Sequence, residues 1–146
     1  YLALCNLGHT YNKLRQFDKA IQSLQRAIEI KPDFAQAHFN LGVVLGEAGH
    51  LLKEIEAYNH AISLNPNYAE AYFNLGIAYG ELGRHDEEIL VYQRGVRIKP
   101  NDAHAHYNLA LAYFSIGESK SAFEEYKILK SINEPLAQEL LRIISK

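Results

Sequence analysis

Residues 72–79 read Tyr-Phe-Asn-Leu-Gly-Ile-Ala-Tyr, and the triplet Asn-Leu-Gly inside this stretch occurs three times in the chain. The triplet stands at 6–8, 40–42 and 74–76, and residues 108–110 read Asn-Leu-Ala. The spacing is 34 residues in every case, so the 146-residue chain holds four such periods and a short tail. A fixed period of this length indicates one supersecondary unit that is stacked on copies of itself.

Each period predicts two amphipathic helices. Apolar or small residues recur at i, i+3, i+4 and i+7 and so make one face of each helix. In the first helix of the first period these residues are Leu4, Leu7, Gly8 and Tyr11. In the second helix they are Ala20, Ile21, Leu24, Ala27 and Ile28. Gly and Ala in these faces let neighbouring helices approach closely, so we expect these positions to form the core.

The turns are predicted by glycines and prolines at fixed places in the period. The positions between the two helices that can supply a positive φ are Gly49, Gly83 and Gly117, and Arg15 stands at the same place in the first period. Proline disfavours helix in the residue before it. The second helices are therefore expected to stop near Ile30, Leu64 and Ile98, just before Pro32, Pro66 and Pro100.

The pattern aromatic or Leu, x, x, Leu, Gly, x, x, Tyr, followed by Ala-x-x-x-Tyr and proline, resembles the tetratricopeptide repeat (TPR). The resemblance implies an all-α fold, a right-handed α-solenoid (superhelix) of antiparallel helix pairs that forms a single domain over 1–146. The expected repeats are 1–34, 35–68, 69–102 and 103–136, with a capping helix over 135–145. Histidines at 38 and 106 replace large apolar residues. Glu54 and Glu88 fill a column that is usually Ala, which puts close packing at those points in question.

Composition excludes several classes of protein. The chain is 48% hydrophobic and 22% charged with a net charge of −2, which is typical of a soluble globular protein. The longest stretch without a charged residue, 103–117, is too short to span a membrane. Cys5 is the single cysteine, so no intramolecular disulfide is possible and a cytoplasmic location is expected. The absence of methionine favours an excerpt of a longer protein. No stripe of Lys and Arg indicates a nucleic-acid partner.

The resemblance implies that the first helices line a concave groove, and one groove position is asparagine in every repeat. An amide offers both a donor and an acceptor, so it can pair with the backbone of an extended peptide. Apolar residues flank this column, and Gly46 and Gly80 are expected to leave open space beside it. The candidate peptide-binding residues are Asn6, Asn40, Asn74, Asn108, Phe39, Phe73, Tyr107, Val43 and Ile77. Two alternatives stay open: the asparagines can bond neighbouring helices, and the aromatic residues can pack between helices.

These features predict a scaffold or adaptor that binds an extended or apolar segment of another protein. No catalytic constellation, metal site or cofactor motif can be defended, so the segment is not expected to be an enzyme. The Lys and Arg clamp with which related repeats hold acidic chaperone tails is absent from the groove columns. One alternative is the substrate-recruiting arm of a larger enzyme such as a glycosyltransferase. Another is self-association through the uncapped first repeat, which exposes the apolar face of Tyr1, Leu4 and Tyr11.

Overall fold

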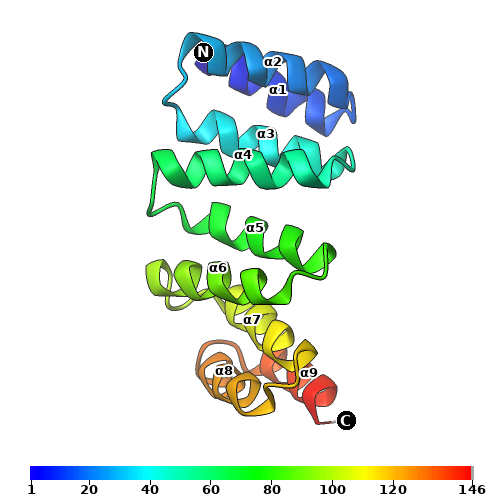
Figure 1. Cartoon of the computed structure of the whole chain (residues 1–146), viewed down its shortest axis with the longest axis vertical. Helices are drawn as coiled ribbons and strands as arrows, with labels where there is room; N and C mark the ends of the chain where they lie inside the picture. The colour runs from blue at the N-terminus through cyan, green and yellow to red at the C-terminus, as the bar shows by residue number, and fades with distance from the viewer. Residues whose placement is uncertain (146) are drawn as a thin grey trace. The chain divides into compact units, whose positions relative to one another are not determined.

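The computed structural model describes residues 1–145 and folds them into helices joined by short turns, with no strand among these residues (Figure 1). The helices are α1 (Leu2–Lys13), α2 (Phe17–Ile30), α3 (Ala35–Glu47), α4 (Leu51–Leu64), α5 (Ala69–Glu81), α6 (His85–Ile98), α7 (Ala103–Ser115), α8 (Ser119–Ile132) and α9 (Glu134–Ile144). The chain divides into two compact units, and the boundary lies within α5, after Ala78. None of these helices combines the length and the apolar character that crossing a bilayer requires.

The turns confirm the predictions made from glycine and proline. Gly49, Gly83 and Gly117 have φ angles of +80°, +69° and +82°, a region that glycine enters without steric cost. Arg15 adopts the same backbone conformation with φ of +55°, and it is the single non-glycine residue with a positive φ in the described chain. The second helices α2, α4 and α6 end at Ile30, Leu64 and Ile98, as predicted.

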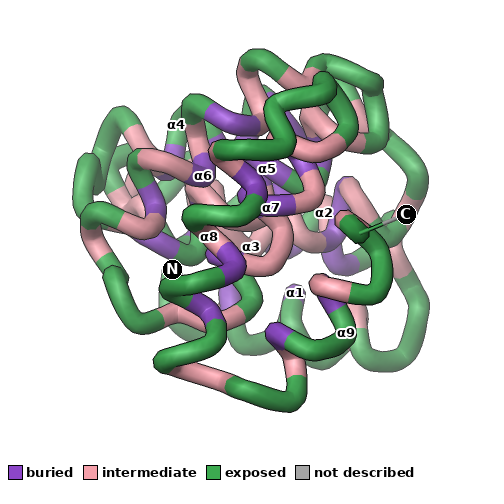
Figure 2. The backbone as a smooth tube through the Cα atoms, turned by 90° about the horizontal axis from the view of Figure 1, so that it is seen from below, coloured by how far each residue is buried: buried purple, intermediate pink, exposed green. Residues whose placement is uncertain are grey.

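In unit 1, residues 1–78, helices α1 to α4 form two antiparallel hairpins that pack on one another through α2 and α3 (Figure 1). Glycines set the spacing of these helices. A Cβ added to Gly8 would lie 2.7 Å from Cγ of Leu24, and one added to Gly42 would lie 2.5 Å from the ring of Tyr58. Figure 2 shows buried positions recurring between exposed ones along the helices, as one apolar face per helix requires.

In unit 2, the residues from Tyr79 onward, α7 and α8 form a hairpin and α9 packs against both. The core of this hairpin includes Leu129, Ala137 and Leu140, all fully buried. The start of α9 is capped by Asn133, whose Oδ1 accepts a hydrogen bond from the Leu136 N–H at 3.1 Å. Pro135 stands in the first turn, where its missing N–H costs nothing. This cap directs α9 back onto the hairpin.

The glutamates at 54 and 88 pack closely because each faces a glycine. A Cβ on Gly46 would lie 2.6 Å from Cδ of Glu54, and a Cβ on Gly80 would lie 3.0 Å from Cδ of Glu88. The first and fourth repeats reverse the sizes, with the pairs Asn12 and Ala20, and Phe114 and Ala122. Close packing is therefore kept at the two glutamates, because a large residue on one helix of the hairpin faces a small residue on the other helix.

We expect the effect of Gly46→Ala on the free energy of unfolding to depend on the residue at position 54 and to change sign when Glu54 is replaced. Alanine is favoured over glycine inside a helix by about 1 kcal/mol, but here its methyl group displaces a buried carboxylate, and overpacking costs about 1–3 kcal/mol. Gly46→Ala should therefore lower the free energy of unfolding of the wild-type chain and raise it when Glu54 is replaced by Ala. Chemical denaturation of the four proteins of this cycle measures the coupling. An equal effect in both backgrounds would contradict this pairing of a large with a small residue.

His106 is a buried ion-pair partner rather than the apolar residue that is usual in its column. Its ring is 4% exposed, Nδ1 lies 2.6 Å from Oε2 of Glu125, and Nε2 lies 2.9 Å from the carbonyl oxygen of Pro100. Both ring nitrogens face acceptors, so this geometry favours the imidazolium form, which donates a hydrogen bond from each nitrogen. The hydrogen bond to Glu125 raises the pKa of His106, and burial of the ring opposes the rise. The charged ring joins α7, α8 and the turn at Pro100.

This ion pair predicts a pH dependence of stability. The pKa of His106 is higher in the folded chain than in the unfolded chain, where it is about 6.5. The stabilisation is therefore complete below about pH 6.5 and is lost as pH rises through the folded pKa. Glu125→Gln should lower the unfolding free energy by about 1–3 kcal/mol at acidic pH and by less at alkaline pH. Denaturation at a series of pH values tests this, with the exposed His104→Gln as control. A pH-independent effect of Glu125→Gln would contradict the charge assignment.

Candidate functional site

The predicted asparagine column occupies one position on each first helix, but its members have different surroundings. Asn6 on α1 is exposed, and Asn40 on α3, Asn74 on α5 and Asn108 on α7 are half-buried. Unit 1 holds the first three, and Asn108 belongs to unit 2. The four side chains therefore cannot be treated as equivalent peptide contacts.

Two of the asparagines hydrogen-bond a buried tyrosine. The Asn74 Nδ2 donates to the hydroxyl of Tyr58 at 3.3 Å, and Asn108 forms the corresponding hydrogen bond with Tyr92. Burial raises the pKa of both tyrosines, a nearby glutamate in each case raises it further, and the asparagine hydrogen bond acts in the opposite direction. The amides thus supply a hydrogen bond to each buried hydroxyl, and Tyr58 is also hydrogen-bonded to Glu54. This is the structural use of the asparagines that the sequence left open.

Asn40 differs because the matching second-helix residue is a leucine. Asn74 and Asn108 each stand sixteen positions after their tyrosine, and the residue sixteen positions before Asn40 is Leu24. Leucine has no hydroxyl to bind, and the Asn40 Oδ1 instead accepts from Nε2 of Gln36 at 2.9 Å. The Asn40 amide consequently forms no bond to the second helix of the preceding repeat, and it lines a small pocket instead.

This pocket, which we call the α1–α3 pocket, has a volume of about 180 Å³. Its lining combines apolar side chains with three polar ones: His9, Asn12, Leu24, Phe39, Asn40, Val43 and Val44. Oδ1 of Asn12 is buried and accepts no hydrogen bond from any residue in the described part of the chain. The Nδ2 of the same side chain donates to Oε1 of Glu47 at 3.3 Å. The pocket is therefore a mainly apolar cavity, and one of the residues that line it, Asn12, carries a buried acceptor without a partner among the described residues.

The predicted aromatic and aliphatic contacts separate into two groups. Phe39 and Val43 line the α1–α3 pocket, and the Phe39 ring also packs on Tyr68, with centroids 4.9 Å apart. Tyr107 packs against the unit 2 core and its hydroxyl donates to Oε1 of Glu139 at 3.4 Å. Phe73 is half-buried and Ile77 is 46% exposed. The structure thus brings together Phe39, Asn40 and Val43, and it gives Tyr107 a partner within unit 2.

The expectation of open space at Gly46 and Gly80 is wrong. The carboxylates of Glu54 and Glu88 occupy the volume beside these glycines. With Glu47 next to Asn12, the surroundings of the α1–α3 pocket are acidic rather than purely apolar. Asn12 stands in the same column as Gly46, Gly80 and Phe114, where it is the single polar residue. A polar residue in this column is the signal by which the sequence could have revealed the buried acceptor. The comparison of repeats does not, however, show which atoms have hydrogen-bond partners.

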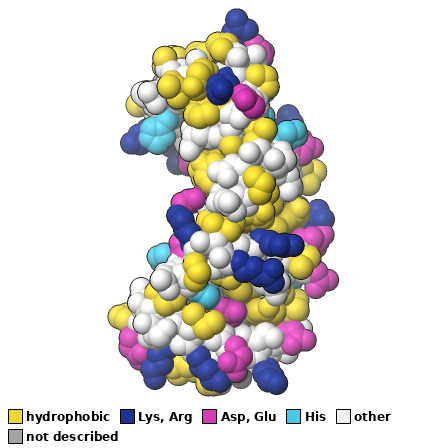
Figure 3. Space-filling view, turned by 90° about the vertical axis from the view of Figure 1, so that its left-hand side faces the viewer, with side chains coloured by type: hydrophobic (Ala, Val, Ile, Leu, Met, Phe, Trp, Pro, Cys, Tyr) yellow, Lys and Arg dark blue, Asp and Glu magenta, His cyan; other side chains and the backbone are white. Residues whose placement is uncertain are grey.

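Charge on the surface is mixed on the face drawn in Figure 3. Lys and Arg side chains there lie among Asp and Glu side chains, and yellow apolar side chains separate them. Within the described residues no group of three or more His, Cys, Asp and Glu side chains has the arrangement of a metal site. The chemistry on offer is therefore hydrogen bonding and apolar contact.

Helix hairpins repeated at a fixed period, packed through small residues and carrying a pocket on their first helices, define the helical-repeat class of proteins. The chain belongs to the tetratricopeptide repeat family. Models described as "TPR repeat" and "Tetratricopeptide repeat" match residues 8–49, 55–83 and 81–117, and residues 35–68 and 103–134, respectively. The predicted family and the all-α solenoid fold class are confirmed. No curated protein sequence matches the chain.

Solved structures with the same fold include two of MamA. The first has 32% sequence identity and a TM-score of 0.86, and the match covers 92% of this chain and 79% of that one. The second has 32% identity and a TM-score of 0.83, with coverage of 92% and 74%. The first TPR of Spaghetti (RPAP3), bound to the HSP90 peptide SRMEEVD, has 23% identity and a TM-score of 0.77, covering 80% of this chain and 92% of that one. Family and neighbours together make this chain a protein-interaction module.

Proposed function

We propose that the chain binds an extended segment of another protein along α1 and α3 in unit 1 and anchors one apolar side chain of that segment in the α1–α3 pocket. The observation that carries this proposal is the mainly apolar α1–α3 pocket together with its lining residue Asn12, whose buried Oδ1 has no hydrogen-bond partner among the described residues. A buried acceptor without a partner costs free energy, and a donor from a ligand would remove that cost. A backbone N–H beside an apolar side chain supplies the two complementary groups.

The size of the pocket limits the ligand and its affinity. A volume of about 180 Å³ suits one aliphatic side chain. Full burial of such a side chain contributes about 1.5–3 kcal/mol, and a neutral hydrogen bond adds about 0.5–1.5 kcal/mol net. Association also costs translational and rotational freedom. These gains sum to about 2–4.5 kcal/mol, which is less than the roughly 8 kcal/mol of a micromolar complex. The pocket therefore sets the register of the bound segment, and further contacts on α1 and α3 must supply the rest of the affinity.

The charges around the pocket argue against an acidic segment. The HSP90 peptide on the Spaghetti TPR contains two glutamates and an aspartate. Here Glu47 lies next to Asn12, Glu54 lies behind Gly46, and no Lys or Arg lines the pocket. A carboxylate placed there would be repelled. The expected ligand carries N–H donors and aliphatic side chains instead.

The pocket is tested by Asn12→Leu. Peptides are selected from a displayed library of random sequences on the wild-type chain, and calorimetry measures their affinity for each variant. Asn12→Leu should weaken pocket-binding peptides about tenfold, whereas the midpoint of thermal unfolding should not fall, because the variant removes an unsatisfied buried acceptor. Asn59→Leu on α4 is the matched control, since that asparagine is exposed and lines no described pocket. Unchanged affinity of all selected peptides for Asn12→Leu would refute the proposal.

Among the asparagines, Asn40 is the informative one to replace. Replacing Asn74 or Asn108 by Ala removes a hydrogen bond from a buried tyrosine hydroxyl, so a loss of binding could reflect damage to the fold. Asn40→Ala breaks an exposed side-chain bond only. Weaker peptide binding by Asn40→Ala with unchanged stability would support contact with the ligand.

Self-association is a second candidate function, and it is favoured by a comparison of the exposure of one leucine position between repeats. Leu7 on α1 is 41% exposed, whereas its equivalents Leu75 and Leu109 are each 1% exposed. The side chain of Leu7 is therefore an apolar surface on α1 that its equivalents in the third and fourth repeats do not present. A second copy could cover it.

Light scattering over a range of concentrations tests the self-association. If the face of Leu7 mediates it, the mean mass of the wild-type chain should rise with concentration, and Leu7→Glu should abolish the rise. Leu52→Glu on α4 is the control, because Leu52 is equally apolar and 67% exposed. A constant monomer mass for the wild-type chain would exclude this candidate.

A further inference from the structure

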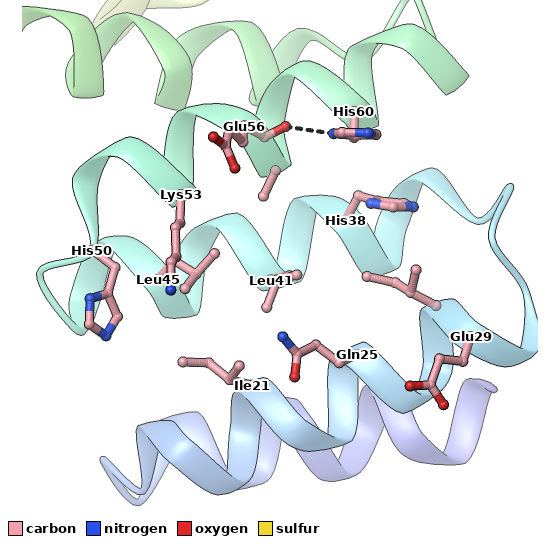
Figure 4. Close-up of a pocket in the computed structure, with 12 residues that line it drawn as sticks. Ile21, Gln25, Glu29, His38, Leu41, Leu45, His50, Lys53, Glu56 and His60 are labelled. Atoms are coloured by element: carbon pink, nitrogen blue, oxygen red, sulfur yellow. Dashed lines mark hydrogen bonds between the residues drawn. The ribbon is translucent and has the colours of Figure 1, made fainter.

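Unit 1 has a second, larger groove between α2 and α4, with α3 as its floor (Figure 4). Its volume is about 690 Å³. The floor is apolar, with Leu41 and Leu45, and the walls carry Ile21 and Ala57. His38 and His60 lie at one end of the groove, and His50 and Lys53 lie toward the other end.

The same place in unit 2 is filled by two side chains of the chain itself. Positions 45 and 57 correspond, two repeats later, to Tyr113 and Glu125. The Tyr113 hydroxyl accepts a hydrogen bond from Nε2 of Gln93 at 2.6 Å. Oε2 of Glu125 lies 2.6 Å from Nδ1 of His106. A phenol and a carboxylate thus satisfy a glutamine and a histidine there.

Unit 1 keeps the glutamine and the histidine but lacks the groups that satisfy them. Gln25 and His38 are the equivalents of Gln93 and His106, and both line the groove. The Nε2 of His38 lies 2.9 Å from the carbonyl oxygen of Pro32, as Nε2 of His106 does from that of Pro100. On its other side the His38 ring stacks on His60, with centroids 5.5 Å apart. Within residues 1–145 no carboxylate forms an ion pair with His38.

The hydrogen-bonding groups of the groove favour an acidic occupant. His50 and Lys53 stand where unit 2 has Glu118 and Ser121, and neither forms an ion pair among the described residues. Two glutamates lie on the rims of the groove, Glu29 and Glu56. Glu29 is paired with Arg26 at 2.5 Å, which neutralises it. A carboxylate entering the groove therefore meets the ammonium group of Lys53 and the imidazole rings of His38 and His50 as hydrogen-bonding partners, and Glu56 is the one rim acid without an ion-pair partner among the described residues.

We propose that this groove, the α2–α4 groove, docks a partner-protein segment that carries an acidic side chain next to an aromatic one. The carboxylate takes the place beside His38 that Glu125 takes beside His106, and the aromatic ring covers Leu45 and reaches Gln25. The proposal commits to this occupant because unit 2 shows which two groups complete the same framework. It goes beyond the α1–α3 pocket, since α3 turns His38, Leu41 and Leu45 to the groove and Phe39 and Val43 to the pocket.

The test converts the open groove into its filled counterpart. Peptides from a displayed library of random sequences are selected on the wild-type chain, with counter-selection on Ala57→Glu, which supplies the missing carboxylate internally. The enriched peptides should contain Asp or Glu within a few positions of an aromatic residue. Synthetic versions should bind Ala57→Glu about tenfold more weakly than the wild-type chain, as expected for one lost charge-assisted hydrogen bond. They should bind Asn12→Leu with unchanged affinity.

A second variant guards against a folding defect in Ala57→Glu. Lys53→Glu reverses an exposed charge at the groove and should also weaken these peptides, whereas the exposed Lys120→Glu in unit 2 should have no effect. Peptides whose affinity is the same for wild type, Ala57→Glu and Lys53→Glu would overturn the proposal. So would groove-dependent peptides without an acidic residue, or a groove occupied by a second copy of the chain. Failure of the α1–α3 pocket would show separately, as unchanged affinity for Asn12→Leu of all the peptides that are selected without this counter-selection.

Discussion

The close approach of the two helices in each hairpin is the constraint on which the rest of the structure depends. Gly8 lies against Leu24 and Gly42 lies against Tyr58 at distances that leave no room for a Cβ. Once the backbones are this close, every other position on the facing surfaces must match its neighbour in volume. The pairing of Gly46 with Glu54 follows from that requirement. The pocket and the groove lie where the matching is incomplete.

Periodicity predicted the elements of this fold but not the partners across helices. The helix ends at Ile30, Leu64 and Ile98 and the positive φ of Arg15 follow from local backbone chemistry, so the sequence alone revealed them. The space beside Gly46 was mispredicted because alignment of the repeats shows which residues are equivalent and not which residues are in contact. The buried acceptor of Asn12 was missed for the same reason. Satisfaction of a polar atom is a property of a pair in space.

The asparagine column shows how one residue type serves two purposes in a repeat protein. Where the preceding second helix supplies Tyr58, the amide at position 74 is used to satisfy a buried hydroxyl. Where that helix supplies Leu24, the amide of Asn40 is left beside a cavity. The choice of tyrosine or leucine in the neighbouring helix thus decides whether the asparagine amide bonds two helices or lines a cavity. Leu45 and Ala57 in unit 1 are replaced by Tyr113 and Glu125 in unit 2, and this difference acts in the same way on the other side of the hairpin.

The pairing of large with small residues inside each hairpin affects how a repeat chain can tolerate the duplication or loss of a hairpin. Gly46 and Glu54 lie within one repeat, as do Gly42 and Tyr58, so each hairpin carries both halves of its own size match. The bond between repeats, from an asparagine to a tyrosine hydroxyl, uses residues that recur along the chain. A hairpin could therefore be copied, deleted or exchanged as a whole without disturbing its interior. Binding surfaces such as those of unit 1 can diverge in one copy while the remaining copies preserve the fold.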